Sequence, residues 1–261
     1  MPEFYKYHGT GNDFIIFDDR GPASVSSLLN QETIARLCER RLGIGADGLI
    51  LIQKHPELDF RMVYFNSDGR EGTMCGNGGR CAVAFARKAG IITDQATFES
   101  IDGVHTASVN EKEIILLSMQ PVSSVKAWEA GYILDTGSPH YILFSENIDG
   151  INVAEEGRRI RYHEHFIPGG TNVNFVEHAD NEIYVRTYER GVEEETLSCG
   201  TGIIASAICS AFRSGTDKNS YNVRTRGGKL RVHFDRTGDT GFSNIRLEGL
   251  AVFVFSGNID L

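Results

Sequence analysis

An internal duplication is the feature of this chain that most constrains its fold. Three landmarks recur in the same order at offsets of 124 to 126 residues: Gly11 and Gly137, Gly45 and Gly170, and Cys75 and Cys199. In the first two pairs a glycine turn leads into an apolar strand, and in the third a Cys-Gly-x-Gly turn leads into a helical segment. Repetition on this scale predicts two homologous halves, each consisting mostly of strands around one principal helix.

The pattern of apolar residues is consistent with such halves. Helical patterns occupy residues 31–41, 78–89 and 202–213, whereas short β-branched and aromatic runs elsewhere indicate strands. The apolar pattern breaks within residues 119–130, which predicts a boundary there. We expect an α+β fold of two pseudo-symmetric domains, each a mostly antiparallel, barrel-like sheet wrapped around a central helix. Residues 1–118 plus 250–261 form the half with Cys75, and residues 119–249 form the half with Cys199.

Composition narrows the possible partners. The chain has 261 residues, 41% of them hydrophobic, and a formal net charge of −9. A protein with this negative charge is not expected by composition to bind nucleic acid or an anionic membrane, because both need a basic surface. It can still bind a small zwitterionic molecule. No apolar run is long enough to span a bilayer, and the N-terminus has no signal-peptide pattern, so we expect a cytoplasmic protein. Its five cysteines lack CxxC spacing, which disfavours a disulfide framework or a zinc site.

Cys75 and Cys199 each stand immediately before a helix start. Unpaired N–H groups at such a start favour the thiolate and bind anions. If the halves pack as a pseudo-dimer, the two sulfurs face each other across a small ligand. A substrate carboxylate then lies on the N–H groups of the residues that follow each cysteine: Gly76, Asn77, Gly200 and Thr201.

Opposed thiols predict acid–base chemistry at a carbon next to that carboxylate. One sulfur, as thiolate, removes the proton, and the other, as thiol, delivers a proton to the opposite face. The carbon inverts, with no cofactor and no metal in the scheme. His140 and Glu189 are candidates for shifting the pKa values of the two sulfurs.

Six segments carry a resemblance to a known family: GTGNDF, FNSDG, MCGNGGRC, GSPH, TNVNF and YERGVEEETLSCGTG. Together they resemble the diaminopimelate epimerase family over essentially the whole chain. The resemblance implies interconversion of LL- and meso-2,6-diaminopimelate, a step of lysine and cell-wall precursor biosynthesis. It also implies a site between two similar domains, a cofactor-independent two-base mechanism and a homodimer.

By the same resemblance, Cys75 and Cys199 take the two catalytic positions. The positions that hold the substrate are matched by Asn12, Asn66, Asn172, Glu189 and Arg190, and those that tune the cysteines by His140 and Glu189. The chain departs from the family at Gly48 and Ser138, where glutamine and asparagine are usual.

Three other functions are compatible with parts of the sequence. A proline or hydroxyproline racemase also uses two cysteines, although such relatives tend to have histidine where this chain has Asn77. A phosphate- or nucleotide-binding protein would use the glycine turns to bind an anion, but the P-loop lysine pattern is missing. A thiol redox protein is disfavoured by the lack of CxxC. The His163-Glu164-His165 run lacks the HExxH spacing of a metal site.

Overall fold

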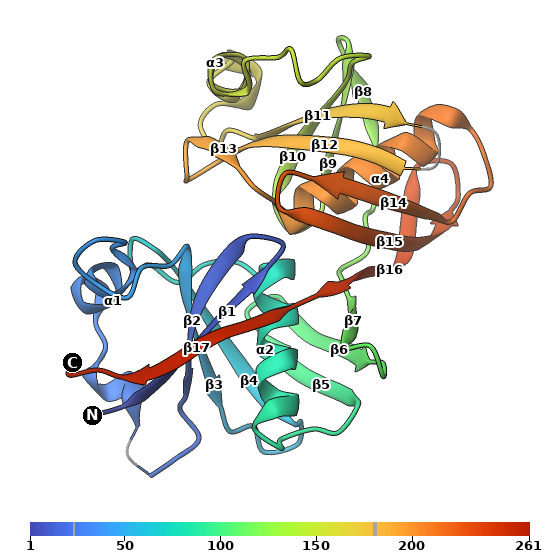
Figure 1. Ribbon diagram of the computed structural model, residues 1–261. Helices are drawn as coiled ribbons and strands as arrows, with labels where there is room; N and C mark the ends of the chain where they lie inside the picture. Colours follow the sequence, from blue (N-terminus) through green and yellow to red (C-terminus); the bar gives the residue numbers. More distant parts are fainter. Residues whose placement is uncertain (23, 180–181) are drawn as a thin grey trace. The chain divides into compact units, whose positions relative to one another are not determined.

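The computed structural model describes residues 1–22, 24–179 and 182–261. It divides into two compact units, one formed by Met1–Leu117 with Gly249–Leu261 and the other by Ser118–Glu248 (Figure 1). We call these unit 1 and unit 2. Among the described residues, no helix has the length and apolar character needed to cross a membrane.

Unit 1 is a mostly antiparallel sheet. Its strands lie in the order β17-β1-β2-β3-β4-β5-β6-β7, and only the β2–β3 and β4–β5 pairs are parallel. The bounds are β1 (Glu3–Gly9), β2 (Asn12–Asp18), β3 (Gly48–Gln53), β4 (Phe60–Asn66), β5 (Gln95–Ser100), β6 (Gly103–Val109), β7 (Ile114–Ser118) and β17 (Val252–Asn258).

Unit 2 repeats this arrangement. Its strands lie in the order β8-β9-β10-β11-β12-β14-β15-β16, with parallel pairs at β10–β11 and β12–β14 and a short β13 beside β12. The bounds are β8 (Lys126–Trp128), β9 (Gly131–Asp135), β10 (Pro139–Phe144), β11 (Asn172–Ala179), β12 (Glu182–Glu189), β13 (Glu194–Thr196), β14 (Ser220–Thr225), β15 (Gly228–Thr237) and β16 (Gly241–Leu250).

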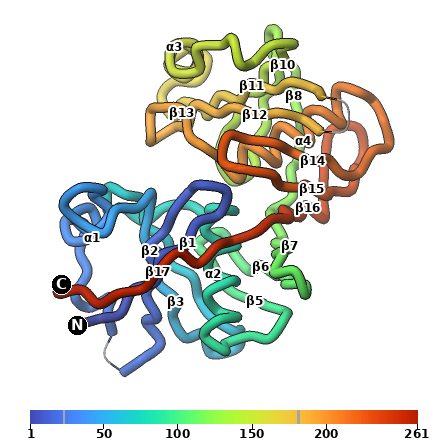
Figure 2. Tube along the Cα trace, in the orientation of Figure 1, coloured from blue at the N-terminus to red at the C-terminus, as the bar shows by residue number. Residues whose placement is uncertain are grey.

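The two sheets correspond strand for strand, parallel pairs included, which confirms the predicted pseudo-symmetric α+β fold. The last strand of the chain, β17, has its counterpart in β8 at the start of unit 2, because β17 pairs with β1 as β8 pairs with β9. Figure 2 shows this last strand, in red, running beside the blue N-terminal strands of unit 1.

One helix lies at the centre of each unit: α2 (Gly76–Lys88) in unit 1 and α4 (Gly200–Ser214) in unit 2. Small side chains let the sheet close around them, since nearly every residue of α4 from Gly200 to Ala211 is buried. A main core cluster of unit 2 packs around α4, with Ile203, Ile204 and Ile208 against strand residues such as Val223 and Leu247. Cys75 and Cys199 are the N-cap residues of these two helices. The packing of each helix in its core therefore fixes the position of its cysteine.

A second pair of helices covers the opposite face of each sheet. In unit 1, α1 (Gln31–Cys38) contributes Ile34 and Leu37 to a separate apolar cluster. In unit 2, α3 (Val153–Arg161) contributes Val153 and Ile160 to another. The described residues also include two short 3-10 helices, η1 (Val25–Leu28) and η2 (Glu164–Phe166). Each unit therefore has its cysteine helix inside the curved sheet and its second helix against the outer face.

Candidate active site

Cys75 is the N-cap residue of α2. It has extended backbone angles and a partly exposed side chain, so its sulfur stands at the unpaired N–H groups of the first turn. The sulfur lies 3.6 Å from Oδ1 of Asn12, at the start of β2. Asn77 donates from Nδ2 to the same oxygen over 3.3 Å. Three of the predicted site residues thus meet at one helix start.

A buried arginine, Arg80, donates hydrogen bonds to residues of this helix start and of the preceding β1–β2 turn. Arg80 is completely buried and donates to Oδ1 of Asn77 over 3.0 Å and to Thr10 over 3.1 Å. At the other end of the chain of amides, Asn12 donates from Nδ2 to the carboxylate of Asp47 over 2.7 Å. Because arginine only donates and carboxylate only accepts, both amide orientations are fixed. The carbonyl oxygen of Asn12 therefore faces the Cys75 sulfur.

Cys199 has the equivalent position in unit 2, as the N-cap residue of α4. Its backbone is also extended, but its side chain is buried, with 7% of the residue exposed. The hydroxyl of Thr201 lies 3.4 Å from the sulfur. The environment therefore differs from that of Cys75, which faces an amide oxygen.

His140 lies beneath the first turn of α4. The ring is completely buried, and a Cβ placed on Gly202 would lie 3.3 Å from its Cε1. Burial, followed by the nearby charge of Arg190, lowers the pKa of His140 to about 3. The imidazole is therefore neutral at physiological pH, and it acts on its surroundings as a dipole rather than as a cation.

Asn172 and Arg190 belong to a hydrogen-bonded polar cluster of unit 2. The Asn172 side chain accepts from the backbone N–H of Arg190 over 2.8 Å and donates to Oγ of Ser138 over 2.9 Å. The Arg190 guanidinium also donates to Ser138, over 3.2 Å. Ser138 is thus part of the cluster despite replacing the usual asparagine. Glu189 precedes Arg190 and accepts a hydrogen bond of 2.8 Å from Thr196.

Asn66 ends β4 and is exposed. It pairs in register with Gly48, which pairs in turn with Phe14 of β2, so Asn66 and Asn12 belong to the same end of the sheet. A side chain at Gly48 has no room here, because its Cβ would lie 2.5 Å from Cε2 of Tyr64 and 2.5 Å from the carbonyl oxygen of Phe65. The Tyr64 ring occupies the space beside Gly48.

The remaining cysteines are buried thiols away from helix starts. Burial raises the pKa of Cys38 to about 12, and it raises the pKa values of Cys81 and Cys209 as well. A buried thiol of this kind stays protonated and unreactive. The contrast singles out Cys75 and Cys199, the two cysteines that cap helices.

Several contributing residues were not predicted from the sequence. Arg80 lies within the MCGNGGRC segment itself, but nothing in the pattern separates a buried arginine from a surface one. Asp47, which directly precedes β3, is 35 residues from Asn12 in the chain, and the β2–β3 pairing brings the two together.

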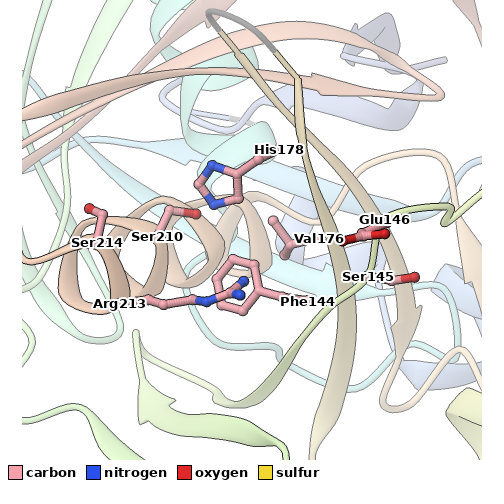
Figure 3. Close-up of a pocket in the computed structure, with 8 residues that line it drawn as sticks. All are labelled: Phe144, Ser145, Glu146, Val176, His178, Ser210, Arg213 and Ser214. Atoms are coloured by element: carbon pink, nitrogen blue, oxygen red, sulfur yellow. The ribbon is translucent and has the colours of Figure 1, made fainter.

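A separate hollow lies at the other end of α4 (Figure 3). It has a volume of about 650 Å³. The guanidinium of Arg213 lies over the Phe144 ring, 4.6 Å from its centroid, and His178 approaches the same ring at 5.5 Å. None of the predicted site residues lines this hollow.

Comparison with known sequences identifies relatives over the whole chain. The family model described as diaminopimelate epimerase matches residues 4–125 and 132–252. A diaminopimelate epimerase of Flavobacterium psychrophilum is 48% identical over 258 residues, which cover 98% of this chain and 100% of the relative. One from Aquifex aeolicus is 41% identical over 275 residues, covering 98% of this chain and 97% of the relative.

Solved structures with the same fold are more distant in sequence. A phenazine biosynthesis protein of the PhzF family from Bacillus anthracis has a TM-score of 0.75 at 17% identity, covering 100% of this chain and 99% of its own. A probable proline racemase from Agrobacterium radiobacter has a TM-score of 0.73 at 16% identity, covering 100% of this chain and 93% of its own. At these identities the likeness concerns the fold alone.

Proposed function

Because this chain belongs to the diaminopimelate epimerase family, we propose that it interconverts LL- and meso-2,6-diaminopimelate with Cys75 and Cys199 as the two acid–base groups. The observation that carries the two-cysteine assignment is the equivalence of the two helix starts. Each unit has a cysteine at the N-cap of its central helix, in the same place relative to the same strands. Membership of this family identifies the enzyme as an isomerase.

In this mechanism the two cysteines act on opposite faces of one α-carbon. The substrate carboxylate lies on the N–H groups that follow each cysteine, those of Gly76, Asn77, Gly200 and Thr201. These donors stabilise the negative charge that grows on the carboxylate as the α-proton leaves. One sulfur takes the proton as thiolate while the other gives its proton to the opposite face, so the carbon inverts and each sulfur exchanges its protonation state.

Polar side chains around the two cysteines recognise the distal amino-acid end of the substrate. The guanidinium of Arg190, held beside Ser138, is suited to a carboxylate, and the carboxylate of Glu189 is suited to an ammonium group. The amides of Asn12, Asn66 and Asn172 complete the set. Such a group of donors and acceptors fits a substrate that is zwitterionic at both ends, which proline is not.

Solvent isotope incorporation tests the reaction. Incubation with LL-diaminopimelate in deuterated water is expected to yield meso product with solvent deuterium at the inverted α-carbon, and no cofactor added. Proline and lysine serve as control substrates. Turnover of proline but not of diaminopimelate would replace the proposed function with that of a proline racemase.

Single-cysteine variants test the mechanism. Cys75→Ala and Cys199→Ala should each abolish inversion, because two-sided proton transfer needs both groups. Cys209→Ala is the matched control, since that thiol lies on the same helix as Cys199 but is buried in the core. Full turnover by either of the first two variants would refute the assignment of that cysteine.

We further propose that the enzyme is cytoplasmic, that it works as a homodimer without a cofactor or metal, and that it binds neither nucleic acid nor membrane. The formal net charge of −9 supports the last point, because polyanions need a basic face. Sedimentation of the purified protein tests the dimer. A monomer with full activity would exclude a required dimer.

A further inference from the structure

A buried network connects β10, β11 and β12 beneath the helix start that carries Cys199. Asn174 of β11 is completely buried at its centre. Its Nδ2 lies 3.0 Å from Nδ1 of His140 and 3.4 Å from the backbone oxygen of Tyr141, and its Oδ1 accepts from Thr187 over 2.9 Å. All four residues belong to unit 2.

The partners of Asn174 fix the orientation of its amide. A backbone carbonyl oxygen can only accept, so the amide atom that faces Tyr141 must be the NH2 group. The Thr187 hydroxyl, on the other side, supplies a donor to the carbonyl oxygen. The NH2 group therefore donates to Nδ1 of His140, which must be the unprotonated nitrogen. Because the buried ring is neutral, its single proton is on Nε2.

That Nε2–H group has no hydrogen-bond partner among the described residues, although it is buried. A buried donor without an acceptor costs about 1–3 kcal/mol, and native proteins rarely keep one without a use. The ring lies against Gly202, which follows Cys199 by three residues, and a Cβ at Gly202 would also lie 2.3 Å from Oδ1 of Asn174. The first turn of α4 thus needs a glycine to approach this network.

We infer that Asn174 is a positioning residue that fixes His140 as the Nε2–H tautomer, so that the ring presents a neutral donor at the first turn of α4, beside Gly202. The inference rests on the proposed function, which places negative charge at this helix start during turnover. His140 neither carries a charge nor moves a proton in this scheme. It contributes a dipole that is already oriented before the thiolate forms, which reduces reorganisation during the reaction.

Nitrogen NMR of protein labelled with ¹⁵N-histidine tests the tautomer directly. The unprotonated and protonated ring nitrogens resonate far apart, so the wild-type spectrum should show Nδ1 unprotonated and Nε2 protonated. A protonated Nδ1 in the wild type would overturn the inference without any variant. This measurement is independent of turnover, so loss of the proposed function and loss of the inference give different results.

The variant Asn174→Asp is expected to reverse the tautomer of His140. A carboxylate only accepts, so Nδ1 of His140 must then carry a proton, and the spectrum should change accordingly. We expect kcat/KM to fall on the order of 10²-fold, the cost typical of losing one oriented donor. Thr187→Val is the matched control, because it removes the hydroxyl at the opposite side of Asn174 and leaves the Tyr141 carbonyl to orient the amide. It should keep the wild-type tautomer.

A double-variant cycle separates the positioning role from general damage. In a His140→Gln background the side-chain amide keeps an N–H donor but has no tautomer to fix. Asn174→Asp should therefore cost much less kcat/KM in that background than in the wild type. Equal losses in both backgrounds, with folding verified by thermal unfolding, would show that Asn174 acts independently of His140 and would overturn the inference.

Discussion

The buried imidazole of His140 makes the stability of the fold depend on pH in a definite direction. Its pKa is lowered from 6.5 to about 3 in the folded protein, chiefly by burial and then by Arg190. Between these two values the unfolded chain binds a proton that the folded protein does not. Stability from this group is therefore complete above pH 6.5 and is lost progressively as the pH falls toward 3.

The size of the effect follows from the pKa difference. Each pH unit in that window costs about 1.4 kcal/mol, so acidification from about pH 7 to about pH 4.5 costs about 2.5 kcal/mol through His140 alone. His140→Gln keeps an amide in place of the ring but cannot titrate. The variant should be less stable than the wild type at neutral pH because its packing is altered, yet it should lose less stability on acidification.

Urea denaturation of both proteins across this pH range measures the difference. Asp13 has its pKa lowered to about 2 by Arg40 and Lys6, against the effect of burial, and it contributes equally to both curves. Subtracting the two curves isolates His140. Parallel curves, with no divergence below about pH 6, would refute the claim that this histidine is held neutral.

Three further predictions concern packing and capping. Gly157→Ala should destabilise the protein by about 1–3 kcal/mol, because the new Cβ would lie 2.3 Å from Cβ of Tyr188; thermal unfolding measures this, and an unchanged midpoint would contradict the close packing of α3 on β12. Gly48→Ala should cost a similar amount and displace Tyr64, seen as a change in tyrosine fluorescence, whereas a stable variant with normal turnover would show that the ring can move freely. Asn30→Ala should cost about 1 kcal/mol, because it removes the N-cap acceptor of α1, and a denaturation midpoint equal to that of the wild type would show that this cap contributes nothing.

The internal duplication extends to the second helix of each half. We predicted the helix that became α1 but not its counterpart α3, although Asn152 followed by glutamates marks a helix start. Hydrophobicity alone predicts a loop for α3, because this helix is polar and has three arginines in its last turn. The repeat offset would have placed α3, because each half has a helix between the same two strands.

The sequence by itself determined three features: an α+β fold with two similar halves, the two cysteines at helix starts, and the family. These features depend on local rules: glycines at turns, apolar periodicity, and residue types at fixed spacing. Only the tertiary structure decided which side chains support each cysteine, such as Arg80 under one turn and Asn174 under the other. Those contacts depend on strand register and on burial, since a guanidinium or an amide has the same sequence signature at the surface and in the core.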